Sequence, residues 1–267
     1  MRDDAFDMLR RMTRARVALG RAGDGLPTAA KLEFQMAHAL ARDAVWGRVN
    51  FEGIADALTP REVIKIASAA TDRAGYLRRP DLGRRLAAGE TARLPSGPFD
   101  LVFVIADGLS ADAVESHAAD VVIATEARLA GLSIGPIVLA SQARVALGDD
   151  VGRAMGARLV ATLIGERPGL SAADSLGIYL TLHPAPGLRD SARNCISNIH
   201  GHGLSAERAA DKLAWLVREA MRIGITGIGL KEAAPDAALE TEAPSALPGA
   251  QRPDIINHTT TGESGHE

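Results

Sequence analysis

The sequence predicts an α/β protein with a mainly parallel sheet, flanked by helices and preceded by a helical N-terminal region. Residues 99–106 form a largely apolar run with β-branched side chains, followed by a turn and a helix start, which is typical of a buried strand entering a βα unit. Further strand candidates alternate with helical patterns, and this order favours parallel strands joined by right-handed crossovers, as in a Rossmann-like sheet. The candidate strands are 134–140, 158–164, 177–182 and 225–230, and the helical patterns lie at 111–130, 147–156 and 205–224.

The N-terminal region has apolar residues at helical spacing. A short amphipathic helix is predicted over 5–17, and glycine and proline then break the pattern over 17–28. A longer helix is predicted over 28–46, with Thr28 as its N-cap. Its apolar residues recur every three or four positions, which indicates one buried face. They are Leu32, Met36, Leu40 and either Ala44 or Val45.

A third helix is predicted over 59–76, because a threonine-proline pair precedes apolar residues at helical spacing. Residues 77–98, rich in Arg, Gly and Pro, are predicted to form an irregular linker. We therefore divide the chain into a helical region with its linker, 1–98, an α/β domain, 99–232, and a tail, 233–267. The tail has no apolar periodicity and too little apolar area to order itself, so we expect it to be disordered.

Composition limits the partners and the core. The chain has 267 residues, of which 46% are hydrophobic and only 3% aromatic, so its core must consist mainly of Ala, Val, Leu and Ile. Its net charge of -3, without a basic run interleaved with aromatic residues, gives no basis for a nucleic-acid partner.

The cellular compartment follows from the cysteine content and from the absence of long apolar runs. The single cysteine, Cys195, excludes an internal disulfide and a cysteine-rich metal site, and it indicates a reducing compartment. No apolar stretch approaches the roughly 18 residues that span a bilayer, and the N-terminal residues lack a secretory pattern. We expect a cytoplasmic protein without a membrane span.

A carboxylate ends one of the candidate strands. Glu166 lies in the motif LIGERPGL, Leu163 to Leu170, where Pro168 disfavours a helix at Arg167. The carboxyl ends of parallel strands are where open sheets bind ligands. The local sequence alone favours an ion pair with Arg167 or a cap for the next turn, and a ligand contact is the alternative.

Two further stretches are candidates for chemistry. Asp107 and Gly108 precede the helix cap Ser110, as in a ligand-binding βα turn, but the Gly-x-Gly-x-x-Gly pattern of dinucleotide sites is missing, so an ordinary connection explains them equally well. The lone Cys195 is more typical of packing than of catalysis, because a strand places His200 on the opposite face from it. His200 and His202 could together bind a metal ion, but no third ligand lies at a suitable spacing. We therefore predict no metal site and no catalytic residue.

Five motifs, taken in order, resemble the light chain (small subunit) of ethanolamine ammonia-lyase. The resemblance covers roughly residues 13–231. The motifs are ARVALGRAGDGLPT, FVIADGLSA, LIGERPGLSAADSLGIYLT, RNCISNIH and GITGIGLK.

The resemblance implies one component of an adenosylcobalamin-dependent lyase that converts ethanolamine to acetaldehyde and ammonia by a radical mechanism. In that family the heavy chain is a β/α barrel that holds the substrate, and the light chain covers the corrin of the cofactor. The resemblance therefore implies a heavy-chain partner in a hetero-oligomer, located in the cytoplasm either freely or inside a bacterial microcompartment.

Three cobalamin contacts are implied by matching motifs. The valine of the ARVALG-like segment matches Val145, the glutamate of IGERPGL matches Glu166, and the cysteine of RNCISNI matches Cys195. The resemblance thus reverses the local preference at Glu166 and gives Cys195 a contact role. Two alternatives stay open, namely a stand-alone corrinoid or nucleotide carrier and a scaffold without a catalytic role.

Overall fold

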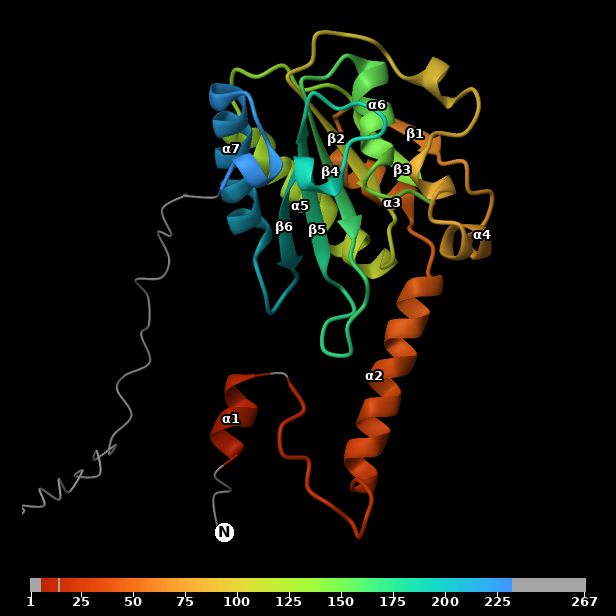
Figure 1. Cartoon of the computed structure of the whole chain (residues 1–267), viewed down its shortest axis with the longest axis vertical. Helices are drawn as coiled ribbons and strands as arrows, with labels where there is room; N and C mark the ends of the chain where they lie inside the picture. The colour runs from red at the N-terminus through yellow and green to blue at the C-terminus, as the bar shows by residue number, and fades with distance from the viewer. Residues whose placement is uncertain (1–5, 14, 232–267) are drawn as a thin grey trace, which may run out of the picture. The chain divides into compact units, whose positions relative to one another are not determined.

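A computed structural model describes residues 6–13 and 15–231 of the chain. The described residues contain one six-stranded sheet (Figure 1). Its strands are β1 (Val63–Ala67), β2 (Leu101–Ala106), β3 (Ile137–Ser141), β4 (Leu159–Gly165), β5 (Leu176–Leu182) and β6 (Arg193–Ile199).

The strand order is β1-β3-β2-β4-β5-β6. β1, β3, β2 and β4 are parallel to one another. β5 is antiparallel to both of its neighbours, so β6 again runs in the direction of β4. The predicted mainly parallel α/β sheet is therefore confirmed.

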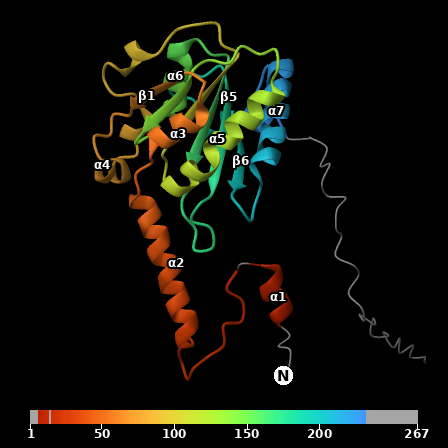
Figure 2. The same ribbon diagram turned by 180° about the vertical axis from the view of Figure 1, so that it is seen from behind.

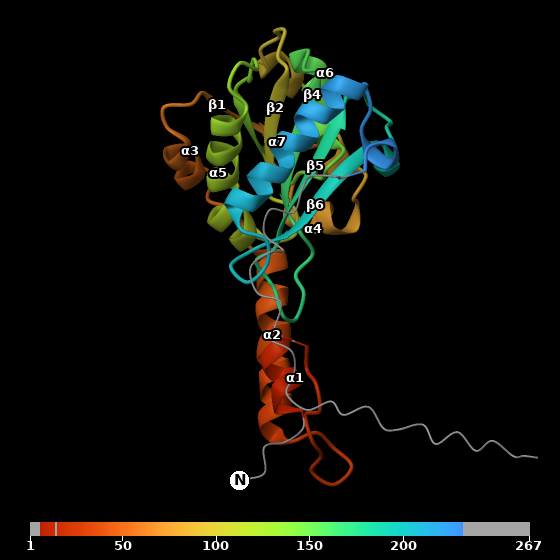
Figure 3. The ribbon, with the colours of Figure 1, turned by 90° about the vertical axis from the view of Figure 1, so that its left-hand side faces the viewer.

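Helices cover both faces of this sheet. α6 lies on the face seen in Figure 1, and α3, α5 and α7 lie on the face seen from behind in Figure 2. α5 and α7 lie side by side (Figure 3). The α-helices are α1 (Asp7–Met12), α2 (Thr28–Trp46), α3 (Phe51–Leu58), α4 (Arg73–Arg78), α5 (Ala111–Arg128), α6 (Leu147–Met155) and α7 (Ala206–Ile223), and the 3₁₀ turns are η1 (Leu82–Arg84), η2 (Glu90–Arg93), η3 (Asp190–Ala192) and η4 (Gly227–Gly229).

The central strand β2 contributes to two apolar clusters. Phe103 and Ile105 pack with α5 and α7 on one face, and Val102 and Val104 pack with α6 on the other. All residues of β2 are buried. Because both faces are covered, the strand is apolar throughout, which is why its position is evident from the sequence.

Several predicted helix boundaries are confirmed. The Ser110 and Ser205 hydroxyls accept hydrogen bonds from the backbone of α5 and α7, at Ala113 and Arg208. The prediction for Thr28 is wrong, because Pro27 occupies the N-cap position of α2. The predicted buried face of α2 is also wrong for this chain, since among its residues only Ala44 is buried.

Two other predictions are corrected. The predicted helix 59–76 is instead strand β1 followed by α4, because Val63 to Ala67 pair with β3 and this pairing overrides their helical spacing. The predicted strand 225–230 is instead the short turn η4, where Gly227 has a φ of 76°. Sequence reasoning also missed α3, whose cap is the Asn50 side chain.

The division of the chain at residue 98 stays a prediction, but β1 from its N-terminal side pairs with β3 from its C-terminal side. The predicted disordered tail, 233–267, lies outside the described residues. None of the described helices is both long enough and apolar enough to cross a bilayer.

Candidate functional site

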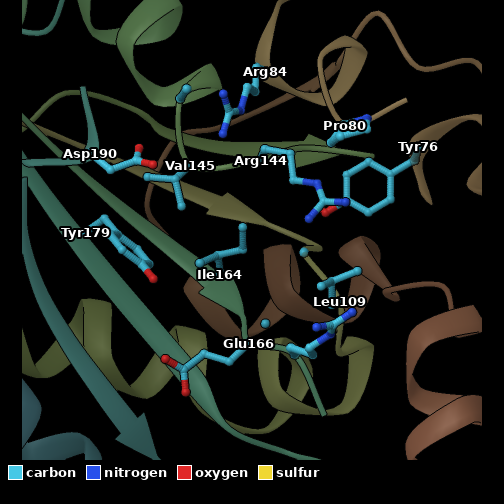
Figure 4. A pocket seen from close by; sticks show the side chains of 14 residues that line it. Tyr76, Pro80, Arg84, Leu109, Arg144, Val145, Ile164, Glu166, Tyr179 and Asp190 are labelled. Atoms are coloured by element: carbon cyan, nitrogen blue, oxygen red, sulfur yellow. The ribbon is translucent and has the colours of Figure 1, made fainter. Parts of the chain in front are cut away.

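A cavity of about 600 Å³ lies at the carboxyl ends of β2 and β4 (Figure 4). This is the sheet edge at which the sequence places the LIGERPGL motif, so the predicted location of a ligand site coincides with a cavity. Val145 and Glu166 line it, together with Tyr179 from β5. The other lining residues are Tyr76, Pro80, Arg84, Gly108, Leu109, Arg144, Ala146, Ile164, Gly165, Arg167 and Asp190.

Two glycines let the ends of β2 and β4 approach each other at the floor of the cavity. Gly108 has a φ of 57°, and an added Cβ there would overlap the carbonyl oxygen of Gly165. A Cβ at Gly165 would in turn overlap the backbone of Ser110. The Leu109 N–H donates to the Gly165 carbonyl at 2.9 Å. The motifs FVIADGLSA and LIGERPGL therefore form one close backbone contact.

Asp107 positions the loop that carries Val145. Its carboxylate accepts hydrogen bonds from the backbone N–H groups of Gln142 at 2.8 Å and Ala143 at 2.9 Å. Burial raises the pKa of Asp107, and these two donors and the guanidinium of Arg73 oppose that rise. The two residues of the predicted ligand-binding turn therefore differ in position. Gly108 lines the cavity, whereas Asp107 binds the backbone of the neighbouring loop.

Glu166 is held at the mouth of β4 by one of its two carboxylate oxygens. The Ser175 hydroxyl donates to Oε2 at 2.6 Å, and the Asn198 backbone N–H donates to Oε2 at 3.4 Å. Oε1 accepts no hydrogen bond from any residue that the structure describes. Glu166 also forms no ion pair with a described residue, so the ion pair with Arg167 is wrong. The protein thus orients the carboxylate through hydrogen bonds to Oε2.

Gly177 makes room for this carboxylate. An added Cβ at Gly177 would lie 2.8 Å from Oε1 of Glu166, which is closer than such atoms pack. The neighbouring strand β5 therefore has no side chain at the one point where Glu166 crosses it.

Cys195 lies beside the cavity and does not line it. It pairs in register with Tyr179, so the two side chains lie on the same face of the sheet. Desolvation raises the pKa of the Cys195 thiol, the Tyr179 hydroxyl opposes that rise, and the negative charge of Glu166 adds to it. A thiol with a raised pKa is mostly protonated at neutral pH and is a poor nucleophile. The contact role that the resemblance implies for Cys195 stays a prediction.

A buried ion pair connects two of the motifs. Asp149, in α6, accepts two hydrogen bonds of 2.6 Å from the guanidinium of Arg193 in β6. Both side chains are about 1% exposed. Because removing one member leaves a buried charge, such pairs hold their elements in place. The segment with Val145 is thereby held next to the strand with Cys195, and neither partner was predicted from the sequence.

The histidines next to Cys195 are explained by local structure. His200 is buried and its Nε2 lies 2.8 Å from Oδ1 of Asn198, and its Nδ1 accepts from the His202 backbone at 3.3 Å. Among the described residues, no three His, Cys, Asp or Glu side chains are grouped so as to hold a metal ion.

The opposite side of the cavity is basic and aromatic. The guanidinium of Arg144 lies over the ring of Tyr76, 4.3 Å from its centroid (Figure 4), and Arg84 lines the same cavity. Sequence reasoning missed these three residues, which come from segments predicted as helix, linker and loop. The arginine-rich composition of 77–98 was the only available signal.

Comparison with known proteins decides the family. The family model of the ethanolamine ammonia-lyase light chain matches residues 3–231. The chain is 51% identical over 238 residues to an ethanolamine ammonia-lyase small subunit of Bradyrhizobium diazoefficiens, covering 86% of this chain and 91% of that one. It is 50% identical over 253 residues to the small subunit of Xanthomonas campestris, covering 91% and 93% of the two chains.

The chain belongs to the ethanolamine ammonia-lyase light chains. A third relative, the small subunit of Pseudomonas fluorescens, is 48% identical over 245 residues, 88% of this chain and 89% of its own. As a light chain, the protein is one subunit of an enzyme, and its family name implies a heavy-chain partner. The resemblance that the motifs indicated is thus confirmed.

Proposed function

We propose that this light chain forms one side of the adenosylcobalamin site of an ethanolamine ammonia-lyase, which converts ethanolamine to acetaldehyde and ammonia together with a heavy chain. The observation that carries the proposal is Glu166, an oriented carboxylate with one uncommitted oxygen at the mouth of a cavity of about 600 Å³. Buried sites recognise amides through such acceptors, and corrin rings carry several amide side chains.

The residues around the cavity fit this cofactor. Oε1 of Glu166 would accept a hydrogen bond from a corrin amide, and Val145 would supply an apolar contact. Tyr179 and Cys195 extend the same face of the sheet. When bound, adenosylcobalamin supplies the radical that begins the reaction, while the light chain binds and orients it and excludes water.

We expect the light chain to supply no group to the chemical step. The two candidate reactive side chains have other tasks, because Ser175 and Asn198 hold Glu166 and a raised pKa keeps Cys195 protonated. The substrate chemistry then belongs to the heavy chain and the cofactor.

The exposed face of α2 supports a partner chain. Large apolar side chains at Leu32, Met36 and Leu40 are exposed on this helix. Contiguous exposed apolar surface is typical of a protein interface. Because the family name implies a heavy chain, we assign this face to that chain.

Reconstitution of the activity tests the proposal. The light chain, the heavy chain from the same organism and their mixture are assayed with ethanolamine and adenosylcobalamin, and acetaldehyde is measured. We expect turnover only from the mixture. Turnover at the same rate from the heavy chain alone would show that the light chain is a scaffold.

The role of Glu166 is tested separately in the assembled complex. We expect Glu166→Gln to weaken equilibrium binding of cyanocobalamin by about tenfold, because a hydrogen bond to a charged group contributes about 1.5–3 kcal/mol. Glu207→Gln, which alters a surface carboxylate paired with Arg128, is the matched control and leaves the affinity unchanged. Equal affinities of the two variants would contradict the assigned contact.

A further inference from the structure

Three arginines line the cavity, Arg84, Arg144 and Arg167, and the last of them directly follows Glu166. Arg84 and Arg144 both line it, and neither forms an ion pair with a residue in the described ranges. The neighbouring arginines of the same segment are paired, Arg79 with Asp81 and Arg85 with Asp150. Arg84 and Arg144 thus place at the cavity two positive charges without an ion-pair partner among the described residues.

Arg144 is held in place before any ligand arrives. Its guanidinium stacks over Tyr76, which is fully buried and donates its hydroxyl to the Ala143 carbonyl at 3.2 Å. The Arg144 backbone N–H donates to the Gly83 carbonyl at 2.8 Å. Its Nε is buried and has no hydrogen-bond partner among the described residues. An unpaired donor on a fixed, planar guanidinium is suited to an oxyanion such as a phosphate.

Gly83 lets the turn η1 pack against Arg144. An added Cβ at Gly83 would lie 2.9 Å from Cγ of Arg144 and 3.0 Å from the ring of Tyr76. Arg84 follows directly, at the end of η1, and is exposed. The turn η1 therefore packs closely on Arg144, and the Arg84 side chain, which follows Gly83, lines the same cavity.

The cavity has opposite chemical character at its two sides. Arg144 lies with Tyr76 on one side, whereas Tyr179, Asp190 and Glu166 lie on the other (Figure 4). Arg84 also lines the cavity, and so does Arg167, which directly follows Glu166. A ligand with an anionic group near Arg144 and a hydrogen-bond donor near Glu166 would match this arrangement. With a volume of about 600 Å³, the cavity is much larger than a free phosphate ion.

We propose that Arg84 and Arg144 form an anion subsite for the phosphodiester in the nucleotide tail of cobalamin. This inference rests on the proposed function, in which Glu166 binds an amide of the same cofactor. The amide side chains of the corrin match the acidic side, and the phosphodiester, the cofactor's own negative charge, matches the basic side. Free inorganic phosphate offers similar chemistry, and the experiment separates the two.

The test compares two corrinoids on the assembled heavy-chain and light-chain complex. Cyanocobalamin carries the phosphodiester and dicyanocobinamide lacks the whole nucleotide tail, and dissociation constants are measured for both by equilibrium dialysis. We expect Arg144→Gln and Arg84→Gln each to weaken cyanocobalamin binding by about 10-fold and cobinamide binding by less than about twofold. Arg85→Gln, whose arginine is paired with Asp150, is the matched control and changes neither.

Arg84→Gln keeps the test valid if Arg144→Gln disturbs the packing on Tyr76, because Arg84 is exposed. Equal weakening of both corrinoids, or no weakening of either, would overturn the inference. Inorganic phosphate should compete with cyanocobalamin in the wild-type complex and not with cobinamide. Saturable phosphate binding at these arginines that leaves cyanocobalamin affinity unchanged would assign the subsite to free phosphate and overturn the proposal.

The same binding measurements distinguish an error in the proposed function from an error in the phosphodiester subsite. If the wild-type complex binds neither corrinoid, the cobalamin site itself is wrong. If it binds both and the arginine variants do not discriminate between them, only the phosphodiester subsite is wrong.

Discussion

α2 and α7 have nearly the same length and the same apolar spacing, yet only one of them is covered by its own chain. They have 19 and 18 residues. In α7, Leu213 and Leu216 are 0% and 2% exposed, because they pack against β5 and β6. In α2, Leu32, Met36 and Leu40 are 58%, 62% and 53% exposed. Periodicity thus identifies a helix and its apolar face, but not the chain that covers that face.

Truncating one leucine in each helix tests this comparison with the largest expected effect. We expect Leu213→Ala to lower the free energy of unfolding of the isolated light chain by about 2–5 kcal/mol, because it opens a cavity in the core. Leu40→Ala should change it by less than about 0.5 kcal/mol, since Leu40 is already largely in water. Urea unfolding measures both. Similar losses would show that α2 is covered within the chain.

Affinity for the heavy chain should depend on the exposed apolar face of α2. We expect Met36→Glu with Leu40→Glu to weaken heavy-chain affinity by about tenfold or more, because it places charges in an apolar contact. Gln35→Glu with His38→Glu adds the same charge to exposed positions of α2 and serves as the control. Isothermal titration with the heavy chain measures both. An equal loss from the two pairs would indicate a general charge effect and contradict an apolar interface.

The rate at which the Cys195 thiol is alkylated should also differ between the isolated chain and the assembled complex, by a smaller factor. In the isolated chain the thiol is exposed, but its raised pKa leaves less thiolate at neutral pH than in a free cysteine. We expect slow labelling by iodoacetamide that accelerates as the pH rises through this pKa. The assembled complex with cobalamin should protect the thiol. Unchanged labelling rates on assembly would place Cys195 outside the covered surface.

The sequence predicts those features that depend on neighbouring residues. β2 is evident because it is apolar on both faces, and Ser110 and Ser205 are evident as caps because the cap and its partner are three residues apart. β1 was predicted as helix because its short apolar run fits both periods, and only its pairing with β3 decides between them.

The candidate site depends on contacts between distant segments. The motifs of the family indicate Val145, Glu166 and Cys195, but the hydrogen bond from Ser175 that orients Glu166 depends on the antiparallel return of β5. The stacking of Arg144 on Tyr76 joins residues that are far apart in the sequence. No local pattern encodes such a contact, so the basic side of the cavity is found only in the structure.

Cofactor binding by the separate chains tests the central claim most directly. Adenosylcobalamin is titrated into the light chain alone, the heavy chain alone and their complex, and the dissociation constants are determined from equilibrium dialysis. Because the cavity of the light chain forms only one side of the site, the complex should bind about 100-fold more tightly than the light chain alone. Equal affinity of the isolated light chain and the complex would contradict the shared site and identify the light chain as an independent corrinoid carrier.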